Sequence, residues 1–155
     1  MKKKLFISLA LIIVIGGCLF YFIMRPKKTT CILKINQEPY DLVVTKYTIY
    51  SKDGLVTKVL SKQTVKSNDK KRLEEVKENI NNNYKTLNDK YSGYSYKSII
   101  IKNTLISTII IDYKKVDMKK FTNDNGAMKE YVNDNKQFTL TGAKKYYKSI
   151  GANCK

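Results

Sequence analysis

Hydrophobic residues occur along this 155-residue chain in one long run, in stretches that alternate with polar residues, and in stretches that recur every three or four positions. The long run covers residues 5–24, twenty positions without a charged side chain. At about 1.5 Å per helical residue it would reach roughly 30 Å, the thickness of the hydrocarbon core of a bilayer. Lys2, Lys3 and Lys4 precede the run and favour a cytoplasmic amino terminus, because basic residues beside a span tend to stay inside. The pattern predicts one transmembrane helix.

The same run can be interpreted as a lipoprotein signal. Residues 15–17 and Cys18 read apolar, small, small, cysteine, which is the order of a lipobox. Lipidation of Cys18 would make it the new amino terminus and replace the spanning helix with a lipid anchor. Residues 19–24 stay apolar, where a polar tether usually follows a lipidated cysteine, and this favours the spanning helix. Both interpretations divide the chain into an anchor or signal segment, 1–28, and one domain outside the cytoplasm, 29–155.

Alternation of apolar and polar residues predicts a β-hairpin early in the domain. Residues 40–50 and 55–65 both alternate and are rich in β-branched side chains, and Asp53-Gly54 between them is a strong hairpin turn signal. A shorter apolar run, residues 31–35, precedes them. The faces predicted by strict alternation are Val43, Thr45, Tyr47 and Ile49 in the first strand and Leu55, Thr57 and Val59 in the second.

A spacing of three and four residues then predicts a helix over about 69–90, with its cap among residues 67–69 and its end near Gly93. One apolar stripe on this helix predicts a single buried face. The stripe consists of Leu73, Val76, Ile80, Tyr84, Leu87 and Tyr91.

A second hairpin is predicted from residues 94–101 and 105–113. Each strand contains three consecutive isoleucines, which is typical of central strands covered on at least part of both faces. Two short helices follow, residues 117–125 and residues 142–150, the second capped by Thr141. The order β-β-α-β-β-α-α predicts an α+β fold, an antiparallel sheet of two β-hairpins with helices packed on one face, preceded by one N-terminal transmembrane or signal helix.

Charge narrows the range of partners. The chain carries a net charge of +17, and six of its 30 basic residues but none of its 13 acidic residues lie in residues 1–28. The domain therefore keeps a net charge of +11, which attracts polyanions such as anionic lipid head groups and acidic wall polymers. The lysines are scattered and form no long run. An alternative interpretation is therefore that they are spread over the surface and serve only solubility.

Two cysteines bracket the domain. Cys31 lies near its beginning, Cys154 is the penultimate residue, and the third cysteine, Cys18, belongs to the apolar run. In an oxidising compartment such a pair predicts a disulfide. The bond would close a loop of more than a hundred residues, worth about 4–5 kcal/mol in the chain-entropy model.

Residues 110–121, IIDYKKVDMKKF, resemble a block of the YehR-like bacterial lipoproteins. In that family a strand likewise ends in Ile-Asp followed by an aromatic residue or Met, then Val-Asp and an amphipathic turn. Weaker matches extend the resemblance over about residues 45–151. It implies a membrane-tethered α+β protein of the cell envelope and supplies no established catalytic residues. The Cys31/Cys154 pair is not a general feature of the family.

The side chains offer little for catalysis. The chain has no histidine, which excludes Ser-His and Cys-His nucleophile pairs and most transition-metal sites. The carboxylates Asp112 and Asp117 lie at a strand-to-helix junction, where a carboxylate is typically a helix cap. Residues 123–126 resemble a calcium loop, but its first ligand would be Phe121, so the pattern fails. We predict no catalytic, cofactor or metal site.

We therefore expect a membrane-tethered, non-enzymatic extracytoplasmic module of the bacterial cell envelope that binds a partner protein or an anionic surface. The alternative is a small-ligand-binding lipoprotein with a pocket between sheet and helices. Membrane contact is expected through residues 5–24, with no cofactor and no nucleic acid. A flat basic face would favour the first function, and a closed apolar pocket the second.

Overall fold

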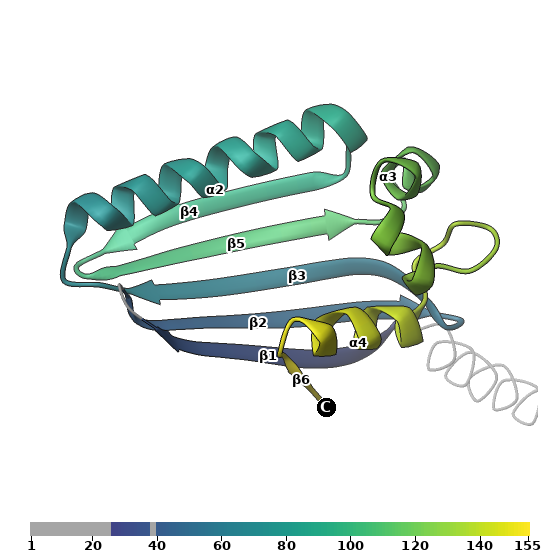
Figure 1. The fold of residues 1–155 in the computed structure, drawn as a ribbon, viewed down its shortest axis with the longest axis horizontal. Helices are drawn as coiled ribbons and strands as arrows, with labels where there is room; N and C mark the ends of the chain where they lie inside the picture. Colours follow the sequence, from purple (N-terminus) through teal and green to yellow (C-terminus); the bar gives the residue numbers. More distant parts are fainter. Residues whose placement is uncertain (1–25, 38–39) are drawn as a thin grey trace, which may run out of the picture.

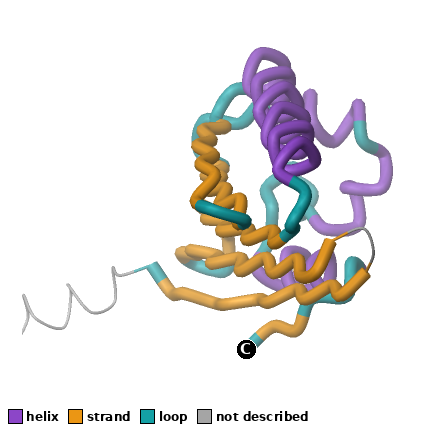
Figure 2. The backbone as a smooth tube through the Cα atoms, turned by 90° about the vertical axis from the view of Figure 1, so that its left-hand side faces the viewer, coloured by secondary structure: helices purple, strands orange, loops and turns teal. Residues whose placement is uncertain are grey.

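The computed structural model describes residues 26–37 and 40–155, which form a six-stranded antiparallel sheet with helices on one side (Figures 1 and 2). The strands are β1 (Lys27–Gln37), β2 (Tyr40–Lys52), β3 (Leu55–Lys66), β4 (Tyr94–Ile101), β5 (Thr104–Asp112) and β6 (Asn153–Cys154), in the spatial order β4-β5-β3-β2-β1-β6. The helices are α2 (Lys70–Tyr91), α3 (Met118–Asp124) and α4 (Leu140–Ser149), with the 3₁₀ helix η1 (Gly126–Tyr131).

The α+β class and the placement of helices on one face are confirmed. The sheet is larger than two hairpins, because β1 and β6 extend it beyond β2. The helix predicted over residues 5–24 lies outside the described residues. Within the described residues, no helix combines the length and the apolar character that crossing a membrane requires.

The turn between β2 and β3 forms as predicted, but the residues of β3 are distributed over its two faces differently from the prediction. Asp53 and Gly54 both have positive φ, 52° and 77°, as a two-residue hairpin turn requires. Tyr50 pairs with Lys58 while Ser51 pairs with Val56, so Thr57 is an extra residue that forms a β-bulge. The bulge shifts the alternation, and Val56 is buried on the same face as Val59. The predicted grouping of Thr57 with Val59 is therefore wrong.

The long helix α2 covers the β4–β5 half of the sheet. The Asp69 carboxylate caps it by accepting a hydrogen bond from the backbone N–H of Arg72 at 3.1 Å. Leu73 and Tyr91, the two ends of the predicted stripe, are buried, and Leu73 packs on Val65 and Leu105 of the sheet. The stripe is thus a core face.

The isoleucine triplets do not mark two central strands. β4 is the edge of the sheet, and Ile99 and Ile101 are 48% and 51% exposed. β5 lies inside the sheet, between β4 and β3. The prediction of coverage on both faces is wrong because the helices pack on one side of the sheet only (Figure 2).

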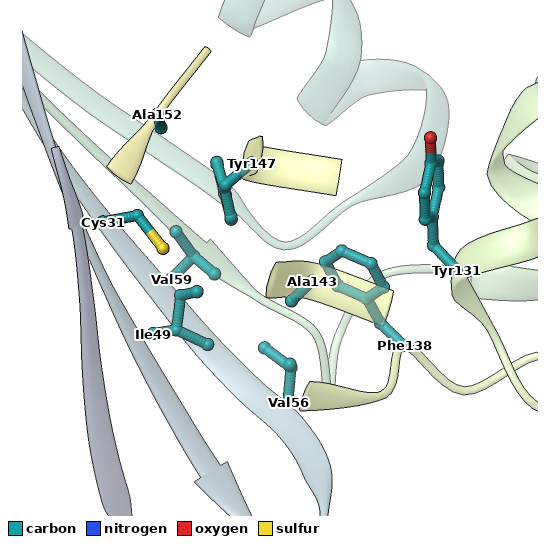
Figure 3. Close-up of a cluster of buried hydrophobic side chains, with 9 residues drawn as sticks. All are labelled: Cys31, Ile49, Val56, Val59, Tyr131, Phe138, Ala143, Tyr147 and Ala152. Carbon is teal, nitrogen blue, oxygen red and sulfur yellow. The ribbon is translucent and has the colours of Figure 1, made fainter. Parts of the chain in front are cut away.

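The carboxyl-terminal helix packs over the other half of the sheet. Its cap is Thr139, whose hydroxyl accepts a hydrogen bond from Gly142 N–H at 2.9 Å, and not the predicted Thr141. A Cβ on Gly142 would collide with the carbonyl oxygen of Tyr131, so only glycine fits there. Ala143 and Tyr147 of α4 then lie against Ile49 of the sheet in the main core cluster (Figure 3).

The last residues return to the first strand. Cys154 of β6 lies opposite Cys31 of β1, and the two form the predicted disulfide. Their Cα atoms are 3.9 Å apart, because a non-hydrogen-bonded pair of antiparallel strands brings opposite residues unusually close. Thr30 and Lys155 exchange both backbone hydrogen bonds beside it, at 3.2 and 2.9 Å. The two ends of the domain are thereby joined.

Candidate binding surfaces

The sheet face opposite the helices bears many lysines. Side chains alternate between the two faces of a strand, and residues directly opposite each other in neighbouring strands lie on the same face. The strand register therefore assigns each residue to the helical face or to the open face. Its single acidic residue among the described strands is Asp112. We call it the lysine face; its lysines, all exposed, are Lys28, Lys34, Lys46, Lys52, Lys58, Lys62, Lys66, Lys97 and Lys155.

The centre of the lysine face contains a row of cations. Lys46 of β2 is directly opposite Lys62 of β3, and the same row continues through Thr108 to Lys97 of β4. Directly opposite residues have Cβ atoms about 4.5–5.5 Å apart, and like charges at that distance repel. The ion pairs of the described residues belong to the helices and their connections, and none includes a lysine of this face.

Apolar and aromatic side chains lie between these lysines. Ile32, Ile99 and Ile101, between 39% and 51% exposed, belong to the same face. The ring of Tyr50 lies between Lys28 and Lys58, whose Nζ atoms are 5.5 and 4.7 Å from its centroid. The surface therefore combines cations with exposed apolar groups.

An open groove of about 450 Å³ lies where β1 meets β6. Lys34 and Lys155 contribute cations to it, and Ile32 contributes an apolar wall. The lining consists of Thr30, Ile32, Lys34, Gly151, Asn153 and Lys155. The groove is a hollow at the edge of the lysine face.

A second hollow, of about 290 Å³, lies on the other face of the sheet, between the sheet and the helices. Six tyrosines from α2, β2, β4, α4 and the segment after β5 line it, and no charged side chain does. We call it the tyrosine cavity; its tyrosines are Tyr47, Tyr84, Tyr94, Tyr113, Tyr146 and Tyr147. The remaining lining is Ser61, Leu87, Ile109, Ile111, Phe121, Met128, Phe138 and Ile150.

The tyrosines of the cavity hold their protons strongly. The pKa of Tyr94 is raised to about 12, chiefly by burial and to a lesser extent by the neighbouring phenols of Tyr84 and Tyr91. Burial likewise raises the pKa of Tyr113 and Tyr147, and nearby tyrosines add to the effect. At neutral pH these phenols are therefore uncharged and can donate or accept hydrogen bonds.

The candidate carboxylates have structural roles. Asp117 caps α3 by accepting a hydrogen bond from Lys120 N–H at 2.9 Å, as predicted. Asp112 accepts one from Lys114 N–H at 3.2 Å in the turn that follows β5. Within the described part of the chain, no group of three histidines, cysteines or acidic residues could hold a metal ion. Cys18 lies outside the described residues.

Sequence reasoning treated the lysines as scattered, but their positions contain a signal. Lys46 in β2 and Lys58, Lys62 and Lys66 in β3 all have even numbers, so each set points to one side of its strand. The pairing of β2 with β3 places both sets on the same face. The tyrosine cavity has no comparable signal, because its tyrosines come from distant segments.

No family model and no curated protein sequence matches the chain. Two structures solved by NMR have a similar fold. Escherichia coli YehR has a TM-score of 0.54 and 18% sequence identity, over 84% of this chain and 93% of that chain. A protein from Streptococcus pneumoniae TIGR4 has a TM-score of 0.50 and 15% identity, over 84% of this chain and 85% of that chain. At such low identity the likeness shows a shared fold alone.

Proposed function

We propose that this protein is a membrane-tethered, non-enzymatic module of the bacterial cell envelope whose lysine face binds anionic lipid. The observation that carries the proposal is the arrangement of nine exposed lysines and one carboxylate, among the described strands, on the sheet face without helices. Lys46 and Lys62 oppose each other there, although the pairing disfavours the folded sheet. An anionic partner would remove that repulsion.

The position of the first strand supports a partner at the membrane. β1 begins at Lys27, so only Arg25 and Pro26 separate it from the apolar run of residues 5–24. Two extended residues span about 7 Å at most. If the run is a spanning helix, the tether would keep β1 within about one Debye length, roughly 8–10 Å, of the head groups. Lipidation at Cys18 would leave a longer tether.

The chemistry of the lysine face suits a lipid surface. A lysine close to an anionic membrane contributes about 1 kcal/mol at moderate ionic strength. Ile32, Ile99 and Ile101 add apolar groups that could enter the interface between head groups and acyl chains. The groove with Lys34 and Lys155 would accept a phosphate of a head group. These features favour lipid over a soluble acidic polymer, which offers no apolar layer.

The roles of the carboxylates favour binding over catalysis. Asp117 and Asp112 both accept backbone hydrogen bonds that shape the junction between β5 and α3. Glu74, an exposed acid of α2, pairs with Lys77 at 3.2 Å. Asp112 belongs to the lysine face but lies opposite Lys58, outside the row of cations at its centre, so we assign the binding role to the lysines.

Vesicle sedimentation tests the proposal. Residues 26–155 contain the core clusters and the disulfide, so this fragment should fold without the apolar run. It should sediment with vesicles of phosphatidylglycerol and phosphatidylcholine, and remain in solution with phosphatidylcholine alone. Replacing Lys46, Lys62 and Lys97 by glutamine should weaken binding about a hundredfold at low salt, since each lysine contributes about 1 kcal/mol.

The matched control removes three lysines from the helical side. Lys70, Lys71 and Lys144 are exposed residues of α2 and α4, and replacing them by glutamine changes the net charge equally. This variant should keep most of the binding. Equal losses in the two triple variants would mean that net charge alone attracts the protein, which contradicts a specific face. Binding to soluble polyglutamate with the same affinity as to vesicles would contradict a lipid partner.

A further inference from the structure

We propose that the tyrosine cavity is a binding site for a compact, uncharged molecule with a flat ring and a hydrogen-bond acceptor. The site lies on the helical side of the sheet, away from the lysine face, and the inference does not depend on membrane binding. The rings, the hydroxyl groups and the absence of charge in the lining define this class of ligand.

The aromatic rings form the walls of the cavity. Tyr47 of β2 and Tyr147 of α4 have ring centroids 4.3 Å apart, and Tyr113 and Phe138 have centroids 5.1 Å apart. On the side of α2, the ring of Tyr84 is 6.4 Å from that of Tyr94. Aromatic faces from opposite walls favour a ligand that is itself flat, because rings gain about 0.5–1.5 kcal/mol per pair beyond their buried area.

Hydroxyl groups of the tyrosines are available inside the cavity. Tyr94 and Tyr147 are only 9% and 4% exposed as whole residues. Among the described residues, Asn81 Oδ1 is the one fully buried side-chain polar atom without a hydrogen-bond partner, so the phenol oxygens of the cavity are not buried orphans. Water in the hollow can solvate them. A ligand with a carbonyl, ether or hydroxyl oxygen could replace that water and accept their hydrogen bonds.

The electrostatics of the lining exclude an ionic ligand. No lysine, arginine or carboxylate lines the cavity, and the phenols stay protonated at neutral pH, so an anion or cation would be desolvated without a counter-charge. The domain's net charge of +11 further opposes a cation such as a quaternary ammonium group. The volume of about 290 Å³ lies at the lower limit of typical ligand pockets, which favours a compact molecule.

The test uses the neutral naphthyl ketone dye prodan, whose emission shifts to the blue in an apolar site. One molecule should bind per chain, in the absence of lipid. Ser61→Phe places a ring in the cavity from the floor of β3 and should abolish binding, as the small side chain of Ser61 leaves part of the space open. Tyr147→Phe and Tyr94→Phe should each weaken binding about 5-fold by removing one donor.

Stability separates a ligand-binding role from a structural one. If these hydroxyls serve a ligand and not the fold, Tyr147→Phe and Tyr94→Phe should melt close to the wild-type temperature while binding the dye more weakly. The control Tyr50→Phe changes a phenol on the lysine face and should leave dye binding unchanged. A lower melting temperature with unchanged dye binding would overturn the proposal.

Two further outcomes would overturn it. Dye binding that survives in a folded Ser61→Phe variant would place the dye outside the cavity; if that variant does not fold, the Tyr94→Phe/Tyr147→Phe double variant decides instead. Displacement of the dye by choline but not by acetophenone, a flat neutral ring with a carbonyl acceptor, would contradict the uncharged class of ligand. Acetophenone competition, lost in the double variant, is the result we predict.

Discussion

Lys46 of β2 and Lys62 of β3 are directly opposite each other on the open face of the sheet, with no carboxylate of the described residues paired to either. Cross-strand pairs of opposite charge stabilise a sheet, and pairs of like charge destabilise it. The folded domain therefore contains an unfavourable contact at the centre of the face that we assign to anionic lipid.

Reversing one charge of this pair should stabilise the fold. Lys62→Glu should raise the free energy of unfolding by about 0.5–1 kcal/mol, because repulsion becomes attraction across β2 and β3. Urea denaturation in low salt measures the change, and high salt should reduce it. Lys34→Glu is the matched control: it makes the same change of net charge opposite Val44, which is uncharged. Equal stabilisation of both variants would contradict a local repulsion.

The disulfide should stabilise the domain without determining its fold. Cys31 and Cys154 are 123 residues apart, and closing such a loop contributes about 4–5 kcal/mol in the chain-entropy model. The Cys31→Ser/Cys154→Ser variant should have a free energy of unfolding that is lower by roughly 2–5 kcal/mol, and should therefore melt at a lower temperature. It should keep the native circular dichroism spectrum at low temperature. The core formed by Leu73, Val65 and Leu105 does not involve the bond.

Reductant provides the second measurement for the disulfide. Wild-type protein reduced to free thiols, as verified by thiol counting, should melt like the double serine variant. Identical melting temperatures for the oxidised and reduced protein would contradict the stabilising role.

Alkaline pH should weaken the fold through the tyrosine cavity. The pKa of Tyr94 is about 12 in the folded protein against 10.0 in a free tyrosine, so the folded state holds this proton more tightly than the unfolded state. Its stabilising contribution is complete below pH 10 and is lost as the pH rises from 10 to about 12. The free energy of unfolding should fall over this interval, as urea melts at successive pH values would measure.

Substitution isolates the contribution of this residue. Tyr94→Phe should make the decrease between pH 10 and 12 shallower, since phenylalanine has no proton to lose, while Tyr113 and Tyr147, whose pKa values burial also raises, maintain part of it. Tyr50→Phe, on the opposite face of the sheet, should leave the decrease intact. An unchanged pH profile in Tyr94→Phe would show that the alkaline transition arises elsewhere.

The elements that sequence predicted best are those with local signals. The Asp53-Gly54 turn and the cap at Asp69 depend on short stretches of chain, and both form as predicted. The apolar run of residues 31–35 marks only part of β1, because Lys27 to Thr30 carry no apolar pattern and join the strand by pairing with β2. β6 has only two residues, too few for a sequence pattern, and it is defined by its pairing with β1 at Cys31.

Other features depend on tertiary structure that no local pattern contains. The extra residue Thr57 reverses the alternation of β3 only because Ser51 pairs with Val56. Thr139, rather than Thr141, begins α4 because the backbone N–H of Leu140 donates to the carbonyl of Gly54 in the hairpin turn. Predicting the lysine face would have required knowledge of the strand pairing. Predicting the tyrosine cavity would have required knowing that five distant segments converge.

Lysine footprinting on the intact chain tests the membrane-binding claim most directly. The full protein is reconstituted into phosphatidylglycerol vesicles or phosphatidylcholine vesicles, acetylated briefly, and analysed by mass spectrometry. In anionic vesicles, Lys46, Lys62 and Lys97 should react several-fold more slowly than in neutral vesicles, while Lys70, Lys71 and Lys144 on the helical side should react equally in both. Equal reactivity of the lysine face in the two lipids, or protection of the helical lysines instead, would contradict the account.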